Sequence, residues 1–277
     1  MKALSLLALA LGVSTLVSAP VEAAQSNWSD TMGARMRVIA GGMETGNLVA
    51  GIEIELEKNW KTYWRNPGGA GIPPQLDFSR STNVKSVDVR WPAPKRYFDG
   101  YATSLVYNDH IVLPLRITPE DPSKAIKLTL DMRYGVCSEI CVPAVGNAAM
   151  LVHPLAADDP AMADRIGAFE QKVPVSDQAA SFRIEGITRV DGKLKIKARV
   201  PDGEGKTDLF SHSSAPLALP LTKQLKTSDA EKVVQFEQRL PKDFPDEPVT
   251  LSFVLVKGSK AVEQSYSISK DAIVDLN

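Results

Sequence analysis

Apolar and polar residues alternate with a period of two along much of the chain. In the segment Asn47–Leu56, for example, Ile52, Ile54 and Leu56 alternate with glutamates. This alternation places apolar side chains on one face and polar side chains on the other, and it is typical of a β-strand with one face in water. The same reasoning predicts strands within 36–56, 75–78, 84–91, 104–107, 110–117, 125–136 and 147–155.

Glycine and proline separate these predicted strands. Residues 66–74 read Asn-Pro-Gly-Gly-Ala-Gly-Ile-Pro-Pro, and shorter breaks fall at 92–94, 108–109 and 119–122. Glycine permits positive φ and proline removes a backbone donor, so these segments are expected to form loops and turns. Many short strands without helical periodicity indicate an immunoglobulin-like antiparallel β-sandwich, here over residues 25–155.

A short linker with a different pattern follows at residues 156–178. The segment Asp158-Asp159-Pro160 is suited to cap a helix with proline in its first turn, and apolar residues within 162–169 fall on one helical face. A helix is therefore predicted in the linker, ending before Pro174.

Strand patterns return after the linker, and Asp191-Gly192 is a hairpin signal between the first two of them. The predicted strands are 181–190, 193–200, 233–240, 249–257, 262–268 and 272–276. They indicate a second, smaller β-sandwich at residues 179–277. The fold class is therefore all-β, with two sandwiches and a short helical linker.

The first 24 residues have the layout of a secretory signal peptide. Lys2 precedes an apolar run at 3–17, and small residues lead up to Gln25. No later stretch approaches the roughly 20 apolar residues of a membrane helix. The mature chain is therefore expected to be periplasmic, without a transmembrane segment, in a compartment where disulfides persist.

Charge and motifs exclude several classes of function. The formal net charge is −1 and the pI is about 6.3, with basic and acidic residues interspersed, so no nucleic-acid partner is expected. There is no Gly-x-Ser-x-Gly elbow, and the glycines at 68–71 lack the lysine and helix of a phosphate-binding loop. No cofactor is predicted.

The candidate chemistry lies in Cys137 and Cys141, the only cysteines of the chain, at the end of a predicted strand. A disulfide between them would close a very small loop and stabilise the fold less than a long-range bridge. This favours a redox-active pair over a permanent structural disulfide, although the spacing is compatible with both. A thiolate metal site is the third alternative.

The metal alternative has little further support in the sequence, so no metal site is predicted. Two thiolates suit copper(I) or zinc, but structural zinc needs four ligands. Met32, Met36 and Met43 are possible soft copper ligands, with packing as their simpler interpretation. The three histidines have no ligand spacing; they are His110, His153 and His212.

The order of several motifs resembles a known family. They are Tyr97-Phe98-Asp99-Gly100, the segment 107–115, Tyr134-Gly135-Val136-Cys137 and Cys141-Val142-Pro143. Over residues 35–155 their order and spacing resemble the N-terminal periplasmic domain of the thiol:disulfide interchange family DsbD. The segment Trp-Lys-Thr-Tyr-Trp-Arg-Asn-Pro-Gly at 60–68 is similar to its ScsB-like branch.

The resemblance implies an immunoglobulin-like domain in which Cys137 and Cys141 are the redox pair, with Cys141 as the attacking residue. Such a pair takes electrons from a membrane-embedded donor of DsbD/ScsB type and reduces periplasmic thioredoxin-fold proteins. Tyr63 and Tyr134 would line the site, with core packing as an equal alternative for both. A cap loop, with Phe98 shielding the pair, would consist of Arg96, Tyr97, Phe98, Asp99 and Gly100.

The sequence departs from the best-known family domain in three ways. Only three residues separate the cysteines, where that domain has a longer insertion. Lys95, Arg96 and Tyr97 replace acidic residues before the cap aromatic, and a nearby positive charge would lower a cysteine pKa. The chain also ends at Asn277 without membrane helices or a thioredoxin domain, so the electron donor is expected to be another protein.

The sequence therefore predicts an exported thiol–disulfide exchange protein that works as one member of an electron relay with other proteins. Two alternatives remain: a non-catalytic periplasmic binding or assembly module with a structural disulfide, and a copper-handling protein.

Overall fold

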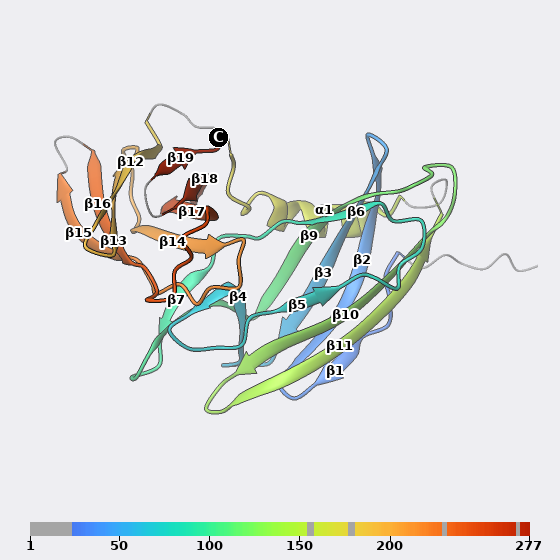
Figure 1. Ribbon diagram of the computed structural model, residues 1–277. Coiled ribbons are helices and arrows are strands. Elements are labelled where there is room, and N and C mark those ends of the chain that lie inside the picture. The colour runs from blue at the N-terminus through green and yellow to red at the C-terminus, as the bar shows by residue number, and fades with distance from the viewer. Residues whose placement is uncertain (1–23, 154–157, 177–180, 229–231, 270–271) are drawn as a thin grey trace, which may run out of the picture.

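Two β-sandwiches joined by a helical segment make up the part of the chain that the computed structural model describes (Figure 1). This part comprises residues 24–153, 158–176, 181–228, 232–269 and 272–277. The all-β prediction is confirmed. The predicted signal peptide, apart from its last residue, lies outside the described residues, and so do the predicted domain boundaries at 155 and 178. Across the described residues, no helix has the length and apolar character needed to cross a membrane.

The first sandwich consists of two antiparallel sheets. One has the order β1 (Ser29–Thr31), β2 (Ala34–Glu44), β3 (Asn47–Leu56), β9 (His110–Thr118) and β6 (Ser86–Val89). The other has the order β11 (Cys141–Val152), β10 (Ile126–Cys137), β4 (Lys61–Gly68), β8 (Thr103–Asn108) and β7 (Lys95–Phe98), with β5 (Gln75–Asp77) also on β10. The core between the sheets contains fully buried Trp64 and nearly buried Tyr134.

The outer face of the first sheet is covered by the predicted helix. Helix α1 (Pro160–Glu170) begins after Asp159, whose side chain accepts a hydrogen bond from the Met162 N–H at 3.1 Å. Ile166 of the helix is buried against the outward side chains of β2 and β9. Gly41 permits this approach, because a Cβ there would lie 2.8 Å from the Ala163 Cα.

The helix also buries Glu53, which the alternating pattern places on a wet face; that expectation is wrong for this residue. The Glu53 side chain is 0% exposed and bonds to Arg37 at 2.6 Å, Arg165 at 2.6 Å and His110 at 2.8 Å. Burial alone would raise the pKa of Glu53, but hydrogen bonds from His110, Arg165 and Arg37 outweigh it and lower the pKa to about 2. One carboxylate thus links β3 to β2, β9 and α1.

Replacing this carboxylate should destabilise the fold in a pH-dependent way. Glu53→Gln removes a fully buried carboxylate from Arg37, which is 11% exposed, and from the more exposed Arg165, and should cost about 3 kcal/mol at neutral pH. Since the folded pKa is below the unfolded value, the wild-type advantage should shrink as the pH falls from about 4.5 towards about 2. Urea unfolding across this range would measure it. Glu55→Gln, in the more exposed pair with Arg35, is the matched control and should change stability by less than about 1 kcal/mol; equal losses would contradict the prediction.

The second sandwich consists of two antiparallel sheets of four strands each. Their orders are β12 (Arg183–Val190), β13 (Lys193–Arg199), β16 (Val233–Arg239), β15 (Lys223–Ser228), and β14 (Thr207–Ser213), β17 (Val249–Lys257), β18 (Lys260–Ile268), β19 (Ile273–Asp275). Phe236 and Phe253 are among the large side chains of its own core. Strands β14 and β15 have no counterpart among the predicted strands.

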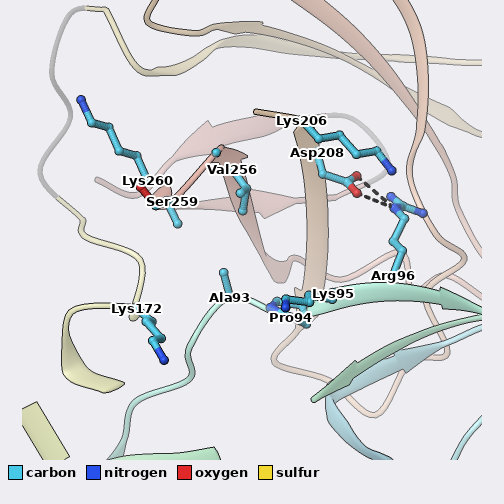
Figure 2. Close-up of a pocket in the computed structure, with 12 residues that line it drawn as sticks. Ala93, Pro94, Lys95, Arg96, Lys172, Lys206, Asp208, Val256, Ser259 and Lys260 are labelled. Carbon is cyan, nitrogen blue, oxygen red and sulfur yellow. Dashed lines mark hydrogen bonds and ion pairs between the residues drawn. The ribbon is translucent and has the colours of Figure 1, made fainter. Parts of the chain in front are cut away.

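Direct contacts join the two sandwiches behind β4 and β7. The Arg96 guanidinium binds both carboxylate oxygens of Asp208, at 2.8 and 3.0 Å, as Figure 2 shows, and also donates to the carbonyls of Leu209 and Thr222. The Trp64 and Phe210 rings meet edge to face, 6.2 Å apart. These contacts fix β7, the edge strand that leads into the predicted cap, to the second sandwich.

Candidate functional site: the cysteine hairpin

The two cysteines face each other at the end of a long hairpin. Strands β10 and β11 pair over twelve residues each, from Ile126↔Val152 to Cys137↔Cys141. The three-residue loop closes with a 3.0 Å hydrogen bond from the Ser138 N–H to the Ile140 carbonyl. The cysteine Cα atoms are 4.1 Å apart, and the side chains form a disulfide. The register of the two strands thus brings the cysteines opposite each other, where their side chains form the disulfide.

The two sulfur-bearing residues differ in exposure. Cys141 is exposed at the start of β11, whereas Cys137 is partly buried at the end of β10. Beside them, Ile140 in the loop is 60% exposed. Thiol–disulfide exchange requires access to a sulfur atom for an in-coming thiolate. The geometry gives this access to Cys141 more than to Cys137.

Tyr63 on β4 is the aromatic side chain in contact with the disulfide. Its hydroxyl lies 3.3 Å from the Cys141 sulfur. The ring occupies the space above Gly135, where a Cβ would lie 2.8 Å from both the ring and Ile72. Burial raises the pKa of Tyr63, and the negative charge of Asp99 raises it further. The hydroxyl therefore keeps its proton and is able to donate to sulfur.

The close contact at Gly135 gives a prediction. Gly135→Ala should displace the Tyr63 ring and cost about 1 to 3 kcal/mol, because a methyl group would overlap two side chains. Urea unfolding of the oxidised protein would measure the loss. Gly186→Ala is the matched strand control, since a Cβ there has open space, and it should change stability by less than about 0.5 kcal/mol. A Gly135→Ala variant as stable as this control would contradict the packing argument.

Tyr134 lies on the other face of β10. Its side chain is 1% exposed in the core between the sheets, and its hydroxyl has no hydrogen-bond partner within the described part of the chain. Burial raises its pKa to about 12. The structure thus brings Tyr63 to the cysteines and places Tyr134 in the core. Tyr134 is three residues before Cys137 on the same strand, so strand alternation puts the two side chains on opposite faces.

The predicted cap segment is the β7–β8 hairpin. The Asp99 carboxylate accepts the N–H groups of Tyr101 and Ala102, both at 2.8 Å, and Gly100 adopts a φ of +101° that suits glycine. Tyr97, just before this turn, lines one cavity with Ser138 and Glu139 of the cysteine loop, so the cap segment lies beside that loop. Phe98 is 65% exposed, and its role as a shield stays a prediction.

The other cap residues divide between the two faces of β7. Tyr97 pairs with Ser104 and is partly exposed. Its ring lies 4.2 Å from the Lys61 ammonium group. Arg96 points the other way and binds the second sandwich, as described above. Lys95 is exposed. Arg96 is therefore turned towards the second sandwich, and the cation that contacts the cap strand at Tyr97 is Lys61.

Lys61 is the site residue that the sequence analysis missed. It is only 7% exposed and is the register partner of Cys137 in the β10–β4 ladder. Strand alternation contains the signal that reveals it, because Lys61 lies two residues before Tyr63 and hence on the same face. The pairing of Lys61 with Cys137 cannot be read from the sequence pattern, because it depends on which strands are neighbours in the sheet.

An open cavity of about 610 Å³ lies beside the hairpin loop. Its lining residues come from the β3–β4 connection, β7, the β8–β9 turn and the cysteine loop, and they are Lys58, Asn59, Trp60, Lys61, Tyr97, Asn108, Asp109, Ser138 and Glu139. The site is therefore a surface with an adjoining hollow, and the disulfide is at its border.

The residues considered as metal ligands have other partners in the structure or lie in the core. The described residues contain no group of three or more His, Cys, Asp or Glu side chains arranged to hold a metal ion. His110 bonds to Glu53, and burial together with the charge of Arg65 lowers the pKa of His212 to about 4. Met36 is fully buried in the core of the first sandwich.

Comparison with known proteins relates the first sandwich to a family. Residues 35–152 match the family described as "Thiol:disulfide interchange protein DsbD, N-terminal". The crystal structure of the N-terminal periplasmic domain of ScsB from Proteus mirabilis superposes with a TM-score of 0.69 at 18% identity, covering 89% of this chain and 98% of that one. That match shows a shared fold that includes both sandwiches. No curated protein matches the chain. Residues 35–152 of this chain thus form a domain like the N-terminal domain of DsbD and ScsB.

Proposed function

We propose that the chain is a periplasmic thiol–disulfide exchange protein. Cys137 and Cys141 pass electrons from a membrane-embedded donor of DsbD/ScsB type to periplasmic thioredoxin-fold proteins. The observation that carries the proposal is a disulfide at a hairpin tip with one exposed cysteine, in a domain like the N-terminal domain of DsbD and ScsB. Exposed Phe98 and Tyr101, at the tip of the neighbouring hairpin, supply apolar surface of the kind that contacts partners.

The exchange proceeds through a mixed disulfide. In the reduced protein, a Cys141 thiolate attacks one sulfur of the partner's disulfide, a Cys141–partner bond forms, and the partner's other sulfur leaves as a thiolate. Cys137 then attacks Cys141, restores the disulfide of the chain and releases the second partner thiolate. Two electrons pass to the partner, and the Cys137–Cys141 disulfide is reduced again by two thiolates of the donor.

Replacing either cysteine should abolish exchange while the sandwiches stay folded. Cys137→Ser and Cys141→Ser should each lose about 2 kcal/mol of stability, which is the loop entropy of so short a closure. Exchange with an oxidised thioredoxin-fold protein, followed by partner fluorescence, should fall to the background rate, and the Cys137→Ser variant should accumulate a trapped mixed disulfide. Val145→Ser, at an exposed position of β11, is the control and should retain exchange.

The reduction potential separates this function from a structural disulfide. Redox titration of the isolated chain against glutathione should give a potential above about −300 mV, because structural bridges lie below that value. A lower potential would sink the proposal and leave the binding-module alternative. Exchange that persists in Cys137→Ser would show that the cysteine pair is not the exchange centre.

A further inference from the structure

Lys61 is a nearly buried residue at the edge of the open cavity beside the cysteine loop. Its ammonium group donates to the Asn59 carbonyl at 3.2 Å and lies over the Tyr97 ring, and among the described residues it forms no salt bridge. Hydrogen bonds from the Ala102 and Tyr101 N–H groups lower the pKa of Asp99, and the charge of Lys61 lowers it further. Burying a charge costs several kcal/mol unless a partner compensates. A second state of the site that supplies a negative charge would provide that partner.

The sheet places Lys61 directly opposite Cys137 on the neighbouring strand. The two residues are directly opposite in the β10–β4 ladder, and β-carbons of such pairs lie about 4.5–5.5 Å apart on one face. Lys61 also shares the cavity beside the loop with the two residues that follow Cys137, Ser138 and Glu139. The other charged residues of the cavity are one cation, Lys58, and two carboxylates, Asp109 and Glu139.

We propose that Lys61 stabilises the thiolate of Cys137 that forms when the disulfide opens. This inference deepens the proposed function and rests on it. A donor thiolate attacks the exposed Cys141 sulfur, so that a donor–Cys141 bond forms, the Cys137–Cys141 bond breaks, and the electron pair leaves on Cys137. The second donor thiolate then displaces Cys141 as the donor becomes a disulfide. Lys61 supplies positive charge where the leaving thiolate develops, and a lower leaving-group pKa speeds exchange.

The same charge assigns different roles to the two cysteines. Cys141 is the accessible sulfur with the Tyr63 hydroxyl at 3.3 Å, and Cys137 is the partly buried sulfur beside a lysine. Lys61 acts on the reaction only through its charge on the Cys137 sulfur, since it transfers no proton or electron. A purely structural lysine would affect folding but would leave the titration of Cys137 in place.

The pKa of Cys137 tests the proposal directly. In a Cys141→Ser background, which leaves one thiol, the pH dependence of iodoacetamide alkylation reports this pKa. Adding Lys61→Met should raise the Cys137 pKa by about one unit or more, because an opposite charge at this range shifts a pKa by 1 to 3 units. Lys61→Arg should keep the lower value. Lys95→Met, which removes an exposed lysine from the same sheet, is the matched control and should leave the pKa unchanged.

The reduction equilibrium gives a second readout in the chain with both cysteines. Above the pKa of Cys137, Lys61→Met should shift the equilibrium with glutathione up to about tenfold towards the disulfide, or about 30 mV. Near pH 6, where both variants hold protonated thiols, the difference should vanish. Circular dichroism checks folding, and Lys61→Gln replaces Lys61→Met if the latter unfolds.

The outcomes separate the inference from the function on which it rests. An unchanged Cys137 pKa in both neutral variants, or an equal shift in Lys95→Met, overturns the role of Lys61 even where exchange with a thioredoxin-fold partner is intact. A shifted pKa without any exchange between the wild-type chain and such partners supports the electrostatic role and sinks the proposed function.

Discussion

The register of the β10–β11 hairpin is the constraint on which the site depends. Tyr134 and Val136 fill the core between the sheets, so they fix which face of β10 points inward. In a strand, shifting the register by one residue exchanges the two faces. Core packing therefore directs Cys137 outward, and the paired strand brings Cys141 opposite it. The apolar residues of the hairpin position the disulfide as much as the cysteines themselves do.

The same alternation organises the neighbouring strands into two functional faces. On β4, Tyr63 shares the outer face with the disulfide, whereas Trp64 belongs to the core and meets Phe210 of the second sandwich. On β7, Arg96 binds Asp208 of that sandwich while Tyr97 lies over Lys61. The second sandwich thus supports from behind the strands that carry the redox face, which is a structural role for a domain whose sequence offers no chemistry.

Local patterns predicted what depends on neighbours in sequence and failed where distant segments meet. The strands predicted for the first sandwich and the capped helix follow from short-range signals and occur in the structure, whereas β1, β4 and β7 were not predicted. Burial of Glu53 does not, because the covering helix comes much later in the chain. The predicted loop from Asn66 was wrong at its start, since β4 continues to Gly68 through a register irregularity that replaces the simple ladder. Lys61 escaped notice because its neighbour Cys137 is distant in sequence.

The environments of the two sulfurs bear on whether the disulfide is a staple or a redox centre. A staple needs only the closed bond, and a loop this short contributes about 2 kcal/mol through chain entropy. Neither a tyrosine hydroxyl at Cys141 nor a buried lysine beside Cys137 adds to that entropy. Burying the lysine opposes folding of the oxidised state, whereas it becomes favourable once a thiolate appears. Under the proposed role of Lys61, the arrangement stabilises the open form of the bond, which is the form that exchange requires.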